Sequence, residues 1–414
     1  MGGGSDGRLR SIVRVQSWFC AICPTEGEYF TTMVVGSSGS GDLIFLTWIP
    51  EGEQQALDSV VRHAYAEILR QLDDRGAVPL QERIFCDLDS ADTVIAARTE
   101  VLGDTIAARI PPTVVEGSPV FGGPIAGIHV IAARPSDPES VRTITWRDAA
   151  CGRRISGEDA DYFALCDVGR LVDRRGPVSA AAQTSNALLL ASDILGASGW
   201  SFDDVCRTWF YLDDILSWYD EFNLARNEVF TNLGLLNGAR AGIIPASTGI
   251  RGRNFRGHQC TLDLLAVKAR PGRELSVTML HNPLQNEAPE YGSAFSRGLT
   301  VATDESQTLF VSGTASIDEA GATIHPGDFD GQTSRTLDNI ESLLASRGAA
   351  MDDICQATAF VKRRDDGRRL LSILNARGLG DLPLICTVDD ICRDDLLVEI
   401  DATAVIPAHS PDNV

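Results

Sequence analysis

The sequence predicts an α+β protein built from three tandem units, at residues 10–140, 141–275 and 288–408. The main observation is an internal repeat, because residues 183–212 align without a gap with residues 332–361, at an offset of 149 (332 − 183). Segments rich in proline and arginine connect the units. Repeated units of this size usually stack to bury faces that none of them covers alone, so we expect the three to pack together.

Both clear copies begin with a helix that ends at a glycine and leads through an acidic turn into a strand. In the later copy Leu337, Ile340 and Leu344 recur at helical spacing, Gly348 ends the helix, and residues 354–361 form a run typical of a strand. A second helix and a closing strand follow, at residues 218–233 and 261–268 in the earlier copy and at residues 368–377 and 396–406 in the later copy.

A fainter copy of the same pattern lies upstream. Residues 56–74 predict an amphipathic helix that ends near Gly76, and residues 83–88 predict a strand. Residues 91–102 then form a second helix, and residues 127–133 a closing strand. We therefore expect the first unit to be a degenerate form of the other two.

The charge of the chain argues against several classes of partner. Its 57 acidic and 36 basic residues give a formal net charge of −21 at pH 7, whereas nucleic acids and anionic membranes favour clustered lysine and arginine. No apolar run approaches the roughly 20 residues that a membrane helix needs, and residues 1–10 are glycine-rich and polar. We expect a cytoplasmic protein whose partner is a small molecule.

The cysteines and histidines do not predict a metal site. Ten cysteines are scattered singly apart from Cys20 and Cys23, and the six histidines show no ligand spacing. The sequence also lacks a glycine-rich phosphate loop. We therefore expect neither a metal nor another cofactor, and reduced thiols.

Glu399 is the candidate proton donor. It lies in a predicted strand in which Val398 and Ile400 take one face while Leu397, Glu399 and Asp401 take the other. A carboxyl group among apolar neighbours is partly desolvated, which raises its pKa and lets it keep a proton near neutral pH. The alternative is an edge strand that carries solvated carboxylates.

Two arginines are candidate clamps for a substrate carboxylate. The fork of a guanidinium group binds carboxylate through two hydrogen bonds. Arg297 is the first choice, with Tyr291 close in sequence to bind substrate or orient it; a surface ion pair is the alternative. Arg226 is a second choice, on a predicted helix where pairing with Asp220 also explains it.

Three further residues are candidates for contact with a substrate. Tyr211 lies on the strand of the second unit, where packing in the core is the ordinary role of an aromatic side chain. Gly313 and Ala315 offer backbone and little bulk, so a planar ring could approach them closely, although a tightly packed strand explains them equally well.

The order of these features resembles the Rid/YjgF superfamily, whose fold is also called chorismate-mutase-like. The resemblance rests on residues 312–314, the helix that carries Gln332, the turn at 352–353 and the closing residues 398–401. Rid proteins are small α+β subunits that form trimers with ligand sites between neighbours. Three fused copies would make this chain a monomeric pseudo-trimer.

The second and third units resemble a narrower family, the chorismatases. The segments that carry this resemblance are residues 207–215, 245–250, 282–288, 291–297 and 312–317. Chorismatases remove pyruvate from chorismate in secondary metabolism. The resemblance implies that chorismate is the substrate, that Glu399 protonates its enolpyruvyl group, and that no cofactor is needed.

The ring product depends on small differences within that family. A cysteine seven residues before the glutamate (399 − 392) marks members that make 3-hydroxybenzoate, so Cys392 favours this product and a catalytic role. Other members make 3,4-dihydroxycyclohexa-1,5-diene carboxylate, which a small side chain such as Ala315 favours. Cys392 can also be read as a small buried apolar residue.

Departures from the Rid pattern limit where chemistry is expected. Rid deaminases carry an arginine fifteen residues before the strand glutamate, and Leu384 occupies that place here (399 − 15). Thr261 stands in the second unit where Glu399 stands in the third, so we expect one working site, between these two units. A diverged enamine or imine deaminase and a catalytically silent sensor of a small acid remain as alternatives.

Overall fold

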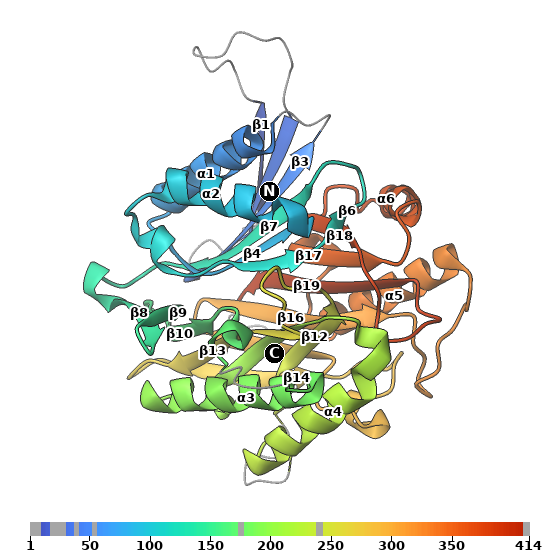
Figure 1. Cartoon of the computed structure of the whole chain (residues 1–414). Coiled ribbons are helices and arrows are strands. Elements are labelled where there is room, and N and C mark those ends of the chain that lie inside the picture. Colours follow the sequence, from blue (N-terminus) through green and yellow to red (C-terminus); the bar gives the residue numbers. More distant parts are fainter. Residues whose placement is uncertain are drawn as a thin grey trace, which may run out of the picture.

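The computed structural model describes residues 10–16, 30–36, 41–51, 56–172, 178–236 and 243–408. Its strands form three sheets, two of six strands and one of seven. Figure 1 shows the sheets gathered around the middle of the molecule with helices on the outside. Among the described residues, no helix combines the length and the apolar character needed to cross a bilayer.

Each sheet and its helices are called a unit here. Unit 1 has the strand order β1-β2-β3-β7-β4-β5. These strands are β1 (Arg10–Gln16), β2 (Phe30–Gly36), β3 (Leu43–Glu51), β7 (Ile125–Ala133), β4 (Val78–Cys86) and β5 (Thr113–Glu116). Its helices are α1 (Leu57–Asp74) and α2 (Ala91–Leu102).

Unit 2 has the strand order β12-β11-β13-β10-β9-β8. These strands are β12 (Ala246–Arg251), β11 (Val205–Leu212), β13 (Cys260–Ala269), β10 (Ala160–Leu165), β9 (Ala149–Ser156) and β8 (Val141–Trp146). Its helices are α3 (Ala180–Ala197) and α4 (Ile215–Asn232).

Unit 3 has the strand order β14-β15-β16-β19-β17-β18 and is extended at the β18 edge by β6, a short strand that follows β5 in the chain. The strands are β14 (Leu275–Leu280), β15 (Gly298–Thr303), β16 (Ser306–Ala315), β19 (Val398–Pro407), β17 (Ile354–Val361), β18 (Leu384–Val388) and β6 (Ser118–Pro119). Its helices are α5 (Phe329–Ala345) and α6 (Asp366–Ala376). The predicted α+β fold of three tandem units is confirmed.

The sequence repeat has a structural explanation at its glutamines. The side-chain oxygen of Gln183, on α3, accepts the backbone N–H of Gln259 at 3.1 Å, and that of Gln332, on α5, accepts the N–H of Leu397 at 2.8 Å. Both bonds fix the turn that leads into the closing strand. Because the N–H of Leu397 is used in this way, β19 begins at Val398, two residues later than the sequence predicted.

The other prominent difference from prediction is the strand β4, which begins at Val78 and not at residue 83. Its pairing with β7 shifts between Pro79 and Gln81. Proline has no N–H to donate, and an irregularity of this kind accommodates it inside a sheet. Because of Pro79, the local sequence pattern did not predict the first residues of β4, which are held in the sheet by their pairing with β7.

The hydrophobic core has a central part and three outer parts. Each unit packs one face of its sheet on its own helices, and each of these layers forms a separate apolar cluster. The opposite faces of all three sheets meet in a central cluster that includes Phe85, Tyr211 and Phe360, one from each unit. The units are therefore joined by a shared core, as expected of repeats that cannot cover both faces alone.

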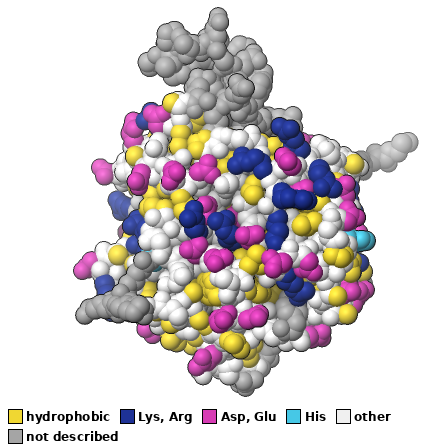
Figure 2. Space-filling model, turned by 45° about the vertical axis from the view of Figure 1, so that its right-hand side comes forward, with side chains coloured by type: hydrophobic (Ala, Val, Ile, Leu, Met, Phe, Trp, Pro, Cys, Tyr) yellow, Lys and Arg dark blue, Asp and Glu magenta, His cyan; other side chains and the backbone are white. Residues whose placement is uncertain are grey.

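Ion pairs connect the two helices on the outer surface of unit 3. Arg369 and Arg377, on and just after α6, pair with Asp330 and Asp338 of α5 at 2.9 and 2.7 Å. On the face shown in Figure 2, basic and acidic side chains are interspersed. Local pairing of this kind does not create the continuous basic surface that nucleic acid would favour.

Candidate functional site

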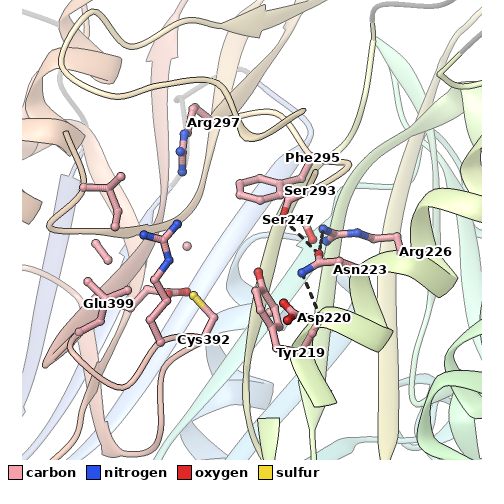
Figure 3. Close-up of a pocket in the computed structure, with 16 residues that line it drawn as sticks. Tyr219, Asp220, Asn223, Arg226, Ser247, Ser293, Phe295, Arg297, Cys392 and Glu399 are labelled. Atoms are coloured by element: carbon pink, nitrogen blue, oxygen red, sulfur yellow. Dashed lines mark hydrogen bonds between the residues drawn. The ribbon is translucent and has the colours of Figure 1, made fainter. Parts of the chain in front are cut away.

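A cavity of about 240 Å³ lies between unit 2 and unit 3. Residues of α4 and β12 line it on the side of unit 2, and residues of β16, β19 and the loop 389–397 line it on the side of unit 3. Figure 3 shows Tyr219, Asn223 and Arg226 of α4 on one side of this pocket, with Glu399 and Cys392 opposite them. Such a volume is at the small end for a ligand site and suits a compact molecule.

Glu399 lies on the face of β19 that points to unit 2. The strand β19 is central, between β16 and β17, and Glu399 pairs with Ala315 on one neighbour and Phe360 on the other. Val398 and Ile400 belong to the outer cluster of unit 3, as their alternation predicted. Glu399 is 5% exposed, so the alternative of a solvated edge strand does not hold.

The environment of Glu399 keeps its carboxyl group protonated at neutral pH. Burial is the largest cause and the negative charge of Asp401 the next, and together they raise the pKa of Glu399 to about 8. The positive charges of Arg297 and Arg207 act in the opposite direction. A carboxylic acid with this pKa, facing a cavity, is suited to donate a proton.

Gly313 makes room for the Glu399 carboxyl group. A Cβ atom at position 313 would overlap Oε1 of Glu399, so a larger side chain would displace the acid. The pairing of β16 with β19 is irregular between Val311 and Thr314, which places this glycine at a bulge. Ser312 fixes the bulge, because its hydroxyl accepts the N–H of Ser247, on β12, at 2.8 Å.

Arg297 and Arg226 bring positive charge to the pocket from two different units. Their side chains are 3% and 2% exposed, so the surface ion pair considered for Arg297 does not describe it. Arg297 donates to the carbonyl of Asn286 at 2.8 Å, and Arg226 to Oδ1 of Asn223 at 2.7 Å. Both guanidinium groups lie 5.5 Å from the ring of Phe295.

Cys392 lines the pocket beside Glu399 as a neutral thiol. Burial, followed by the charge of Glu399, raises the pKa of Cys392 to about 12, although a hydrogen bond with the Tyr219 side chain lowers it. The group is therefore not a thiolate near neutral pH, and general-base or nucleophilic chemistry at this sulfur is disfavoured.

The structure gathers six of the eight predicted site residues around one pocket: Glu399, Cys392, Arg297, Gly313, Ala315 and Arg226. Tyr211 lies elsewhere, in the central cluster, with its ring 6.2 Å from that of Phe85. The side chain of Tyr291 lies outside the part of the chain that the structure describes.

Several lining residues were not predicted. Tyr219 and Asn223 share one face of α4 with Arg226, at a spacing of four and then three residues, so the helical period contained the signal. Phe295 lies within the segment that carried the family resemblance. Within the described ranges, no cluster of three or more His, Cys, Asp or Glu residues is arranged to hold a metal, and Cys20 and Cys23 fall outside those ranges.

Comparison with known proteins finds one matching family model and several similar proteins. Residues 286–406 match the family model described as endoribonuclease L-PSP. The chain is 28% identical over 220 residues to a chorismatase of Streptomyces hygroscopicus, a match that covers 48% of this chain and 60% of that protein. It is 27% identical over 309 residues to a 3-hydroxybenzoate synthase of the same species, and this match covers 69% of this chain and 86% of that protein. The chain is thus similar to the chorismatases.

A solved chorismatase structure shares the fold of this chain, with a TM-score of 0.52 and 23% identity; the match covers 71% of this chain and 86% of the other. A second chorismatase, from Streptomyces rapamycinicus, is 28% identical over 234 residues. The chain spans 60% and 66% of the length of the two curated chorismatases. The predicted resemblance to chorismatases in the Rid superfamily is confirmed.

Proposed function

We propose that the protein is an enzyme that releases pyruvate from chorismate, with 3-hydroxybenzoate as the favoured ring product. The observation that carries this proposal is the arrangement of Glu399, a carboxylic acid protonated at neutral pH, in one pocket with Arg297 and Arg226. Chorismate is a dicarboxylate that carries an enolpyruvyl ether. Its breakdown needs a proton donor and groups that bind two carboxylates, and the pocket offers both.

The two arginines suit a dianion in a protein of net charge −21. Guanidinium groups from opposite sides of the pocket can each bind one carboxylate, which fixes the direction of the substrate. Because Glu399 is neutral, it does not repel the dianion as an ionised carboxylate would. The protonated state therefore serves binding as well as catalysis.

The chemistry starts with transfer of the Glu399 proton to the terminal methylene carbon of the enolpyruvyl group. The adjacent carbon becomes an oxocarbenium-like centre. In the hydrolytic route water attacks this carbon, and the hemiketal collapses to pyruvate and the ring alcohol. In the aromatic route the bond between the ring and the ether oxygen breaks, pyruvate leaves with that oxygen, the neighbouring ring hydroxyl takes its place, and the ring loses a proton. Hydrolysis consumes one water and leaves the dihydroxycyclohexadiene carboxylate. Formation of 3-hydroxybenzoate consumes no net water and leaves an aromatic ring. A well-placed proton donor contributes roughly 10²–10⁴ in rate.

The similarity to a 3-hydroxybenzoate synthase, over 69% of this chain, supports the aromatic product. Cys392 lies in the pocket wall next to Glu399, as a residue that influences the fate of the ring would need to. We assign Cys392 the role of a neutral residue that lines the pocket or forms a hydrogen bond there. Ala315 pairs with Glu399 across β16 and β19 and lines the same pocket with little bulk.

The test is to incubate the purified protein with chorismate in metal-free buffer and follow pyruvate with lactate dehydrogenase. The ring product is identified by chromatography against both standards. Pyruvate with 3-hydroxybenzoate supports the full proposal, and pyruvate with the diene diol corrects the product. Absence of pyruvate, with the protein folded and chorismate intact, overturns the proposed activity.

A further inference from the structure

A second buried carboxylate lies behind the candidate acid. Asp401 follows Glu399 by two residues on β19, so both side chains leave the strand on the same face, roughly 7 Å apart along it. Both are 5% exposed. Two acidic groups in such a position are costly unless one is paired and the other is neutral.

Unit 2 supplies the partners of Asp401. Its Oδ2 atom accepts hydrogen bonds from the hydroxyl of Thr248 at 2.8 Å, from Nη2 of Arg207 at 3.0 Å and from the indole N–H of Trp209 at 3.2 Å. Arg207 is 1% exposed, so this ion pair is shielded from solvent. Three donors on one oxygen hold the carboxylate in a single place.

Unit 1 supports the same group of residues. The guanidinium carbon of Arg83, on β4, lies 3.9 Å from the centre of the Trp209 ring, and that of Arg207 lies 4.5 Å from it. Arg83 also donates to Oε1 of Gln356, on β17, at 2.9 Å. The residues that hold Asp401 therefore connect all three units behind the pocket.

We propose that Asp401 is a positioning residue for Glu399: held by unit 2, it acts as a fixed negative charge that keeps the proton on the acid until substrate binds. This inference rests on the proposed function. In the free protein the positive charges of Arg297 and Arg207 favour ionisation of Glu399, and Asp401 opposes them. A bound dianion would neutralise Arg297, so Asp401 matters most before binding.

The other ionisable groups around Glu399 come from two further elements. The loop 389–397 contributes Cys392 and Arg393, and α4 contributes Tyr219, Asp220 and Arg226. These groups face the cavity that substrate would occupy. Asp401, in contrast, does not line the cavity, and hydrogen bonds from unit 2 hold its negative charge in place near Glu399.

The chain contains a matched control for a purely structural role. In the sheets, Asp263 on β13 lies opposite Trp209 of β11, and Asp401 on β19 lies opposite Thr358 of β17. The repeat offset of 149 makes Thr358 equivalent to Trp209 (358 − 149), so the two aspartates occupy equivalent positions. Asp263 also bonds across a unit boundary, accepting the hydroxyl of Thr113 at 2.7 Å. However, the residue two before it is Thr261, so unit 2 has no acid at the position that Glu399 occupies in unit 3.

The experiment compares pH profiles of pyruvate release for the wild type, Asp401→Asn and Asp263→Asn. Loss of the negative charge lowers the pKa of Glu399, so the falling limb of kcat/KM in Asp401→Asn should move to lower pH by about one unit or more, and the limb of kcat by less. Asp263→Asn should keep the wild-type limb. An Asp401→Asn profile reduced equally at every pH overturns the proposal.

A direct titration separates this proposal from the proposed function. The carboxyl carbon signal of Glu399, assigned by its loss in Glu399→Gln, is followed by NMR against pH in the full-length protein. A lower midpoint in Asp401→Asn, or in Asp401→Ser if the first variant does not fold, supports the proposal even if chorismate is not turned over. An unchanged midpoint overturns it even if pyruvate is formed.

Discussion

The interface between units 2 and 3 and the interface between units 1 and 2 use equivalent strands with different results. Glu399 pairs with Phe360 in unit 3, and Thr261 pairs with Tyr211 at the repeat-related position of unit 2. The first carries a titratable acid at a cavity. The second carries a hydroxyl that accepts a hydrogen bond from Asn254 at 3.1 Å.

The loops before the closing strands account for much of this difference. In unit 2 the loop lies against β5 of unit 1: Asn254 forms a β-bridge with Val115, and a Cβ on Gly252 would overlap the Val115 side chain. In unit 3 the corresponding loop touches β12 at Asp390, whose carbonyl accepts the N–H of Arg251 at 3.1 Å. Beyond this point it turns to line the cavity with Cys392 and other residues.

A raised pKa is not what distinguishes the two interfaces. Burial raises the pKa of Asp167 to about 7 and that of Asp263 to about 6, and these two groups lie together at the boundary of units 1 and 2. Asp263 accepts the backbone N–H of Asp167 at 2.8 Å, so its oxygen is used to hold the fold. An acid becomes a candidate catalyst where a cavity and cationic groups accompany it.

The largest expected effect concerns the acid at the interface between units 2 and 3. Glu399→Gln should lower kcat for pyruvate release from chorismate by at least about 10²-fold, because the amide cannot donate the proton. The control is Thr261→Val at the equivalent position of unit 2, which should remain within about twofold of the wild type. Near-wild-type turnover in Glu399→Gln would falsify the assignment of the acid.

The second effect concerns the space that the acid occupies. Gly313→Ala should lower kcat by about tenfold to a hundredfold, because the added methyl group displaces Glu399. Gly249→Ala is the control in the same pocket, since its Cβ would come no closer than 3.8 Å to Phe222. Equal activities in the two variants would show that the position of the carboxyl group is not critical.

The third effect tests the two arginines. Arg297→Ala and Arg226→Ala should each raise KM for chorismate by about tenfold or more, through loss of a charge-assisted pair of hydrogen bonds. Arg253, whose exposed side chain pairs with Glu116 at 2.7 Å at the boundary of units 1 and 2, provides the control. If Arg253→Ala raises KM as much, general attraction and not a clamp explains binding.

The smallest effect is on stability. The pKa of Glu399 is raised from 4.5 to about 8, so between these values the folded state binds more protons than the unfolded state, and this group lowers the free energy of unfolding as pH rises. Glu399→Gln should therefore increase the melting temperature relative to the wild type by about 2 °C or more at pH 8.5. At pH 4 the gain should be absent, and a gain independent of pH would argue against a raised pKa.

Much of the fold followed from patterns between neighbours in the chain. The helix α2 coincides with its predicted residues, and α1 and β7 differ from theirs by one or two residues at one end. Helical and strand periods depend on residues two to four apart, which the sequence displays directly. The burial of Glu399 could be inferred in the same way, from Val398 and Ile400 beside it.

Other features were decided by contacts that no local pattern contains. Arg207 and Asp401 are 194 residues apart in the chain, yet they form the ion pair behind the acid. Tyr211 and Phe360 occupy equivalent positions in the repeat. Phe360 pairs with the acid Glu399 on the closing strand of unit 3, whereas Tyr211 pairs with Thr261 on the closing strand of unit 2. The path of the loop 389–397 after its contact with β12 likewise decided that Cys392 lines the cavity.

By itself, the sequence determined three tandem α+β units, a strand with one acidic and one apolar face, and a family resemblance. The tertiary structure decided that Arg226 and Arg297 share one pocket, that Tyr211 lies in the central cluster and that Asp401 is held across an interface. The physical reason is range: periodicity reports which face a residue takes, whereas charge, cavity volume and hydrogen bonding depend on what the neighbouring unit places against that face.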